Sequence, residues 1–206
     1  MEHAAAIHAE GHGSDENAAS FERARLGMWF FLASEIMMFG AFIAAYIVLR
    51  MANPNVFKPE YLHEWLSWKV GLFNTAVLIV SSFTMVMAVH AIRNNERGRS
   101  SALIAATAAL GLVFLFVKIK YEYLHDFHAG IAPNTSVFWG CYFLLTGFHG
   151  LHVLIGVIYL LGVIPFMKNF SAERHAHVEL GGLYWHLVDV IWIFLFPLLY
   201  LIPLTT

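Results

Sequence analysis

Five ionisable side chains stand inside long apolar runs of the sequence, where they could carry chemistry. Glu35 interrupts GMWFFLASEIMMFGAFIAAY, His149 and His152 occur in LLTGFHGLHVLIG, and His186 and Asp189 occur in YWHLVDVIW. A carboxyl group can accept or pass on a proton, and an imidazole can titrate near neutral pH or bind a metal ion. Ionisable residues inside a membrane are costly, so they mark functional sites by default.

The fourth apolar run holds two histidines, and Glu35 of the first run has a structural interpretation as a protonated carboxyl group hydrogen-bonded to a neighbouring helix. A spacing of three residues places His149 and His152 on one face of a helix. A protonated Glu35 with a hydrogen-bond partner costs far less than a bare charge in the same place. A metal or haem site is the alternative, but His-x-x-His supplies only two ligands and nothing nearby completes the set. We therefore predict no metal site in this chain.

The last apolar run holds a second pair of polar residues. His186 and Asp189 are also three residues apart, so they share a helix face. The structural interpretation is a pair in which the carboxylate holds the imidazole in one tautomer. The alternative is a functional site inside the membrane.

The third apolar run closes with the charged residues Lys118, Lys120 and Glu122. Long lysine side chains at a span end can extend to the membrane interface, so both lysines are predicted to do so. Small residues in two of the runs allow a neighbouring helix to approach closely and predict helix contacts. They are Gly147, Gly150 and Gly156 in the fourth run, and Ala102, Ala105, Ala106 and Ala109 in the third.

The composition indicates the elements that must position these residues. The chain has 206 residues, of which 59% are hydrophobic and 13% charged, with a mean hydropathy of +0.65. These values are typical of a protein that crosses a membrane several times. The net charge of −2 predicts no nucleic-acid partner, and a single cysteine excludes an intramolecular disulfide or a multi-cysteine metal site.

Each apolar run is close to the roughly 20 residues that a spanning helix needs. The predicted fold is an all-α membrane protein with five transmembrane helices in a bundle, at about residues 26–49, 70–91, 101–121, 136–165 and 183–204. Residues 26–206 then form one transmembrane domain, and residues 1–25 form a polar tail without the apolar core of a cleavable signal peptide.

The tail carries His3, His8 and His12 among several acidic residues. Because histidines titrate near neutral pH, one hypothesis is that the tail collects protons; the alternative is a disordered soluble leader. The short second connection, IRNNERGRS, is the most basic. Positive charge favours the cytoplasmic side, so the N-terminus is predicted to be cytoplasmic and the C-terminus to lie on the opposite side.

Five ordered motifs resemble subunit III of the haem–copper terminal oxidases, the group of cytochrome c oxidases and quinol oxidases. They cover nearly everything from about residue 21 to 204. The motifs are WFFLASEIMMFGAFIAAY, FNTAVLIVSSFTMVMAVHA, KIKYEYLHDF, LLTGFHGLHVLIGVIYL and GLYWHLVDVIWIFLFPLLYL. The longer members of this family have seven helices, whereas this chain is similar to the short five-helix bacterial form.

The resemblance implies a non-catalytic subunit of a proton-pumping oxidase in aerobic respiration, here cytochrome c oxidase. It implies no cofactor in this chain, with haem and copper in partner subunits, and packing against subunit I in a complex that also holds subunit II and other small subunits. The role implied is to stabilise subunit I and support proton uptake. By the matching motifs, the polar residues that carry over are Glu35, His149, His152, Glu122, Trp185, His186 and Asp189, none of them catalytic. The resemblance implies that Glu35 is a buried carboxyl group and that His149 and His152 are its facing partners.

The resemblance also implies bound phospholipid, a multi-pass location in the bacterial cytoplasmic membrane and, for some members, a larger respiratory supercomplex. Three alternatives stay open at this point. The partner complex could be a quinol oxidase or a nitric oxide reductase with a related accessory subunit. A stand-alone transporter would need inverted repeats or broken helices, and the sequence shows neither.

Overall fold

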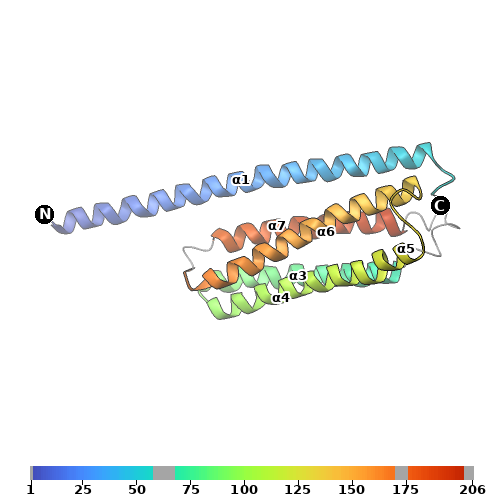
Figure 1. The fold of residues 1–206 in the computed structure, drawn as a ribbon. Coiled ribbons are helices and arrows are strands. Elements are labelled where there is room, and N and C mark those ends of the chain that lie inside the picture. The colour runs from blue at the N-terminus through green and yellow to red at the C-terminus, as the bar shows by residue number, and fades with distance from the viewer. Residues whose placement is uncertain (1, 58–67, 170–175, 202–206) are drawn as a thin grey trace. The chain divides into compact units, whose positions relative to one another are not determined.

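The computed structural model describes residues 2–57, 68–169 and 176–201, with side chains described from residue 22 onward. The chain divides into two compact units, residues 1–37 and residues 38–206. Within the described residues every regular element is helical (Figure 1). The elements are α1 (Glu2–Ala52), α3 (Trp68–Arg93), α4 (Arg97–Val117), η1 (Lys118–Tyr123), α5 (Leu124–His128), α6 (Val137–Val163), η2 (Ile164–Asn169), α7 (Ala176–Phe196) and η3 (Pro197–Leu201).

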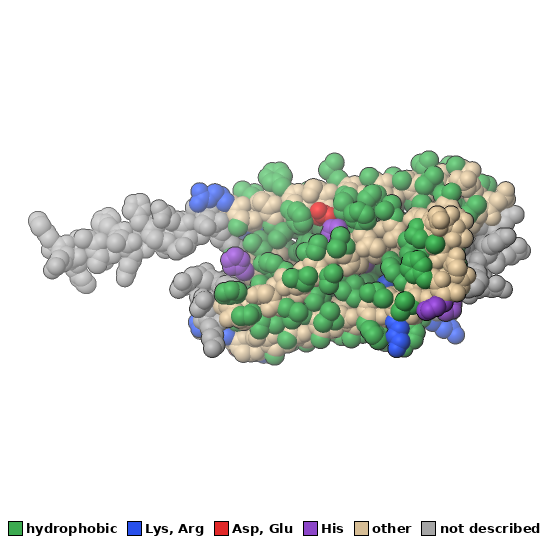
Figure 2. Space-filling view, viewed as in Figure 1, with side chains coloured by type: hydrophobic (Ala, Val, Ile, Leu, Met, Phe, Trp, Pro, Cys, Tyr) green, Lys and Arg blue, Asp and Glu red, His purple; other side chains and the backbone are tan. Residues whose placement is uncertain are grey.

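Five helical segments within the described residues are long and apolar enough to cross a membrane, which confirms the predicted all-α fold. They are Glu22–Ala52, Trp68–Arg93, Arg97–His128, Val137–Met167 and Ala176–Leu201. On the face seen in Figure 2, hydrophobic side chains cover the middle of these helices, and most Lys and Arg side chains lie toward their ends. Apolar side chains match the hydrocarbon of a membrane, and the backbone hydrogen bonds of a helix are satisfied within the helix itself. Such a surface therefore suits contact with lipid.

Two of the predicted spans had wrong boundaries. The third span continues to His128, because the π-helix η1 carries the chain on from Val117 into α5. The fifth span begins at Ala176, because the polar stretch around Glu179 is already helical. Both errors arose where polar residues that are already helical, Asp126 after the third predicted span and Glu179 before the fifth, were interpreted as part of a connection.

The first helix also extends beyond the predicted span. The helix α1 begins at Glu2 and includes the polar tail. The boundary predicted at residue 25 is therefore not a helix end, and the division into tail and transmembrane domain stays a prediction. The side chains of His3, His8 and His12 lie outside the described residues.

In the unit of residues 38–206, four long helices form a closed ring of neighbours. The helix α3 contacts α4 and α7, and α6 contacts the same two helices from the other side (Figure 1). A tight turn joins α3 to α4, with Asn95 in the left-handed region at φ 61°, which asparagine tolerates better than most residues. The end of α1 packs on this ring: Phe42 contacts Phe148 at 5.2 Å between ring centroids, and the Tyr46 hydroxyl donates to the Leu198 carbonyl at 3.2 Å.

Trp185 of α7 fills the centre of the ring. A Cβ atom on Gly111 of α4 would come within 2.6 Å of the Trp185 ring, and one on Gly156 of α6 within 2.9 Å. The indole Nε1 donates to Ser81 Oγ of α3 at 3.1 Å. One side chain therefore sets the approach of α7 to three neighbours, and the predicted contact at Gly156 is confirmed.

Most of the other small residues do not make the close helix contacts that were predicted for them. A Cβ on Gly147 or Gly150 would meet its nearest neighbour at 3.7 Å, which is ordinary contact. The predicted alanine face of α4, at Ala102, Ala105, Ala106 and Ala109, is exposed. The buried stripe of α4 follows the helical spacing on its opposite side, through Ser100, Ile104, Thr107, Ala108, Gly111 and Phe114.

Candidate functional site

A buried ion pair lies at the junction of α4 and η1. Lys118 is 3% exposed and Glu122 is 5% exposed, and the ammonium Nζ donates to Glu122 Oε2 at 2.5 Å. Residues four apart are neighbours on a helix surface, which brings the two side chains together. Single π turns such as η1 occur frequently at functional sites.

Two tyrosines from distant parts of the chain complete this polar cluster. The hydroxyl of Tyr142 on α6 donates to Glu122 Oε2 at 2.5 Å, and the hydroxyl of Tyr200 on η3 donates to the same oxygen. Lys118 also donates to both hydroxyls. The cluster of Lys118, Glu122, Tyr142 and Tyr200, called here the lysine cluster, therefore ties three segments together through charge-assisted hydrogen bonds.

Aromatic rings enclose the lysine ammonium. The Nζ atom of Lys118 lies 4.7 Å from the centroid of Tyr142, 5.1 Å from Tyr200, 5.3 Å from Trp192 and 5.7 Å from Tyr123. Cation–π attraction to several rings favours the cation in a place where water is excluded. The prediction that Lys118 extends to the interface was wrong, because the side chain finds its partners inside. Lys120 is exposed.

The two histidines of α6 point to different surroundings. His149 is fully buried, and its ring packs between Phe114 at 5.5 Å and Trp192 at 4.9 Å. Neither of its ring nitrogens has a hydrogen-bond partner within the described residues. His152 instead lies against Phe39 of α1 at 5.4 Å, and its Nδ1 donates to the Phe148 carbonyl at 2.7 Å.

The two histidines therefore have different neighbours, although their spacing places them on one helix face. Side chains three residues apart on a helix point in directions that differ. Here His149 points into the ring of four helices, and His152 points toward α1. Glu35 belongs to the unit of residues 1–37 and both histidines to the unit of residues 38–206. The predicted contact between Glu35 and these histidines stays a prediction.

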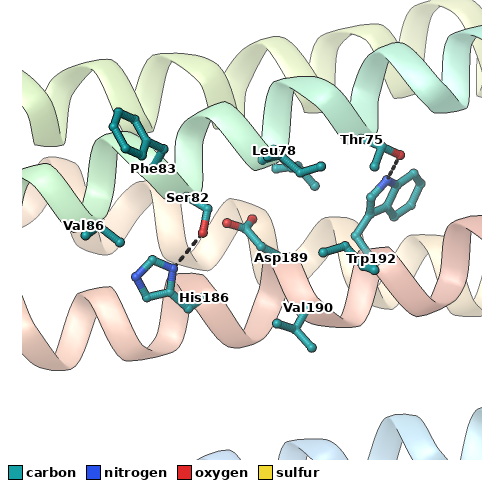
Figure 3. A pocket seen from close by; sticks show the side chains of 11 residues that line it. Thr75, Leu78, Ser82, Phe83, Val86, His186, Asp189, Val190 and Trp192 are labelled. Carbon is teal, nitrogen blue, oxygen red and sulfur yellow. Dashed lines mark hydrogen bonds between the residues drawn. The ribbon is translucent and has the colours of Figure 1, made fainter.

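Asp189 and His186 lie on α7 beside an apolar cavity of about 430 Å³ that opens between α3 and α7 (Figure 3). The His186 Nδ1 atom and Ser82 Oγ of α3 are joined by a hydrogen bond of 2.8 Å. The Ser82 hydroxyl also faces the Asp189 carboxyl group as a weak side-chain hydrogen-bond partner. However, no hydrogen bond of ordinary geometry reaches either carboxylate oxygen from the described residues, although Asp189 is only 4% exposed.

The predicted hydrogen-bonded pair of His186 and Asp189 was therefore wrong. The imidazole is held by Ser82 on the neighbouring helix, so the tautomer depends on a contact between helices and not on one within α7. Further contacts of this type join α3 to its neighbours. Trp192 Nε1 donates to Thr75 Oγ1 at 3.0 Å, and the hydroxyls of Thr84 and Thr107 lie 2.8 Å apart.

Sequence reasoning missed Lys118, Tyr142, Tyr200 and Ser82 as members of these clusters. The spacing of four between Lys118 and Glu122 was a usable signal, because i,i+4 pairs of opposite charge meet on a helix. Nothing local marks the tyrosines, which lie 20 and 78 positions from Glu122. Within the described residues, no three His, Cys, Asp or Glu side chains come together as metal ligands.

Comparison with known proteins identifies the family. A family model described as cytochrome c oxidase subunit III matches residues 4–203. The chain belongs to this family. It is a multi-pass membrane protein and a subunit of a haem–copper terminal oxidase complex, as the motifs predicted.

Relatives of the subunit III chain include members with different electron donors in their names. Cytochrome c oxidase subunit 3 of Thermostichus vulcanus is 41% identical over 180 residues, covering 86% of each chain. Quinol oxidase subunit 3 of Bacillus subtilis is 34% identical over 181 residues, covering 87% of each. Cytochrome c oxidase subunit 3 of Arabidopsis thaliana is 31% identical over 182 residues, which cover 85% of this chain but 67% of the plant protein. The chain is thus similar in length to the first two.

Proposed function

We propose that this subunit III is a non-catalytic component that packs against the haem-bearing subunit I, stabilises it and supports its proton uptake. The supporting observation is that several of its buried polar side chains form hydrogen bonds between helices. Lys118, Glu122 and two tyrosines bond to one another across helices, and Trp185 and Trp192 bond to hydroxyls of α3. This arrangement rigidifies a bundle and gives it a fixed outer surface for a partner.

The same proposal assigns no redox centre to this chain and places haem and copper in the partner subunits. The surroundings of the most enclosed histidine support it. His149 is packed between two aromatic rings, and a metal or haem ligand would need an open direction toward the ion. Haem and copper supply the electron transfer and oxygen chemistry of the complex, and the residues described here act on the packing around them.

For the electron donor we propose cytochrome c, supported by the 41% identity to the Thermostichus vulcanus protein. A quinol donor is the second candidate, supported by the 34% identity to the Bacillus subtilis quinol oxidase subunit. Oxygen consumption by the purified complex, measured separately with reduced cytochrome c and with a short-chain quinol, distinguishes them. Oxidation of the quinol alone would contradict the first proposal.

We further propose the bacterial cytoplasmic membrane as the location, with subunit II, other small subunits and membrane lipids as neighbours within a larger respiratory assembly. Phospholipid headgroups would lie at the basic and aromatic span ends, where Lys120 is exposed near Tyr121 at 5.7 Å. Lipid extraction of the purified complex followed by mass spectrometry tests this part. A complex that retains no phospholipid after extensive detergent washing would contradict it.

Affinity purification of the chain from detergent-solubilised membranes tests the main proposal. We expect it to carry subunits I and II, identified by mass, and a haem spectrum in reduced-minus-oxidised difference measurements. A colourless chain with no haem-bearing partner would overturn the proposed function.

A further inference from the structure

A second carboxyl group lies beside the lysine cluster. Asp126 of α5 follows Glu122 by a step of four residues, and its side chain is 3% exposed. It interacts electrostatically with both Glu122 and Lys118. Among the described residues that face this place, there are therefore two buried carboxyl groups but one ammonium group.

The ammonium group of Lys118 is already paired with Glu122. The Oε2 atom of Glu122 accepts hydrogen bonds from Lys118 Nζ and from the hydroxyls of Tyr142 and Tyr200. Three donors on one oxygen favour the ionised carboxylate, so the charges of Lys118 and Glu122 cancel. An ionised Asp126 then adds one negative charge that neither of them compensates.

A proton on Asp126 removes this excess charge. Burying an uncompensated carboxylate is costly, and a buried carboxyl group takes up a proton instead. The neighbouring elements offer no cation in its place within the described residues. Their ionisable groups at the cluster are Tyr142 and His149 of α6 and Tyr200 of η3. Tyrosine carries no positive charge, and a cation at His149 would be repelled by Lys118.

His125 connects Asp126 to solvent. Its Nδ1 atom lies 3.7 Å from Asp126 Oδ1, and its side chain is 61% exposed. Both residues lie near the end of the span Arg97–His128, at the end of the bundle opposite the turn between α3 and α4 (Figure 1). An exposed side chain changes rotamer within picoseconds to nanoseconds, which brings the two atoms to hydrogen-bond distance. Histidine exchanges protons with water near neutral pH.

We propose that His125 and Asp126 form a proton-exchange site at this end of the subunit. A proton moves from His125 Nδ1 to Asp126 Oδ1, and it leaves a neutral imidazole and a neutral carboxyl group beside the lysine cluster. The imidazole then takes its next proton from water. This site goes beyond the packing role proposed above, because it lets the pH at one membrane surface act on the contacts of η1 with α6 and η3.

Infrared spectroscopy of the purified complex locates the proton. A protonated carboxyl group has a C=O stretching band that an ionised one lacks, and the band shifts in heavy water. We expect such a band to grow as the pH falls from about 8 to about 5, and to be lost in Asp126→Asn. Asp189→Asn is the matched control and should retain the band, because Asp189 is also buried but lies on α7, away from the lysine cluster.

The role of His125 is tested by the rate of deuterium exchange. After a rapid change to heavy water, the band of Asp126 shifts as its proton is replaced. We expect His125→Gln to slow this shift several-fold, because the exposed imidazole that carries the proton is gone. His128→Gln is the control, since His128 is exposed on the same helix, and it should leave the rate unchanged.

Stability should follow the same proton. An aspartate in an unfolded chain is ionised above about pH 4, so the folded subunit holds one proton more and loses stability as the pH rises. We expect the thermal midpoint of the subunit in the complex to fall by about 2–4 °C between about pH 5 and about pH 8. Asp126→Asn is neutral at every pH and should flatten this profile, whereas His128→Gln should not.

Each contrary outcome overturns a stated part of the inference. A pH-dependent band that persists in Asp126→Asn would place the proton on another group. A wild-type complex without such a band would show that Asp126 stays ionised, as in a fixed ion pair with an imidazolium, and this result does not depend on any variant folding. Equal exchange rates in His125→Gln and the wild type would overturn the role of His125 alone.

Discussion

The ammonium group of Lys118 contacts side chains from four segments, and Glu122 is the only carboxylate bonded to it within the described residues. A charge taken out of water must be compensated by its partners, so the pair acts as a unit. Removing one member leaves the other charge buried. Removing both together leaves an apolar space that side chains of similar volume can fill.

The first prediction concerns this pair. Lys118→Met should destabilise the subunit by about 3–5 kcal/mol, the usual cost of breaking a buried pair, and the double variant Lys118→Met/Glu122→Leu should recover most of that loss. The thermal midpoint of the subunit in the purified complex measures both. Lys120→Met is the control, because Lys120 is exposed. Equal midpoints for Lys118→Met and Lys120→Met would contradict the prediction.

The second residue-scale prediction concerns Glu35, which we propose fixes the packing that supports subunit I. Glu35→Ala removes a hydrogen-bonding group from an apolar helix, so we expect a lower pumping stoichiometry and faster inactivation during turnover. Glu35→Gln keeps a neutral hydrogen-bonding group of similar size, and should preserve both properties more nearly. Normal stoichiometry and lifetime of Glu35→Ala in a fully assembled complex would show that the residue has no such role.

At the scale of elements, the sequence predicted the helices well and their contacts poorly. An apolar run long enough to span lipid is visible in the residues themselves, which is why all five spans were found. The boundaries at His128 and Ala176 were missed because the polar residues beside them, Asp126 and Glu179, are as compatible with a solvent-exposed connection as with the end of a helix. Tyr142, Tyr200 and Ser82 could not be assigned, because their partners are defined only once the helices have packed.

The ring of helices leads to a prediction about its two closest contacts. Gly111→Ala and Gly156→Ala each push a Cβ atom into Trp185, so each should destabilise the subunit by about 1–3 kcal/mol, as overpacking usually does. Gly162→Ala is the matched control on α6, because nothing lies within 4 Å of a Cβ there. Thermal midpoints of the three variants test this. Equal thermal midpoints of Gly156→Ala and Gly162→Ala would contradict the prediction, because the Trp185 ring would then move aside without any loss of stability.

The long first helix carries the tail hypothesis. Residues 2–25 are part of α1, so the predicted proton-collecting histidines belong to a helix. Deleting residues 2–15 should lower turnover at alkaline pH, where protons are scarce, and leave turnover at neutral pH nearly unchanged. The pH profile of oxygen consumption by the purified complex measures this. Identical profiles with and without the segment would eliminate proton collection by the tail.

At the scale of the whole molecule, the connections have to alternate between the two sides of the membrane. Arg93 at the end of α3 donates to Glu179 near the start of α7, so these two helix ends lie on the same side. The basic turn between α3 and α4 carries Arg97 and Arg99 at that same side. Because positive charge is retained in the cytoplasm, this side should be cytoplasmic, together with the N-terminus.

Reporter fusions test this orientation. Alkaline phosphatase, which is active only outside the cytoplasm, should be inactive when fused after Asn95 and active when fused after Thr206. A green fluorescent protein that folds only in the cytoplasm should give the opposite pattern at the same two positions. Reversal of both reporters at both positions would overturn the orientation and keep the five spans. The same side for both positions would contradict the count of spans, because three membrane crossings separate the turn from the C-terminus in this fold.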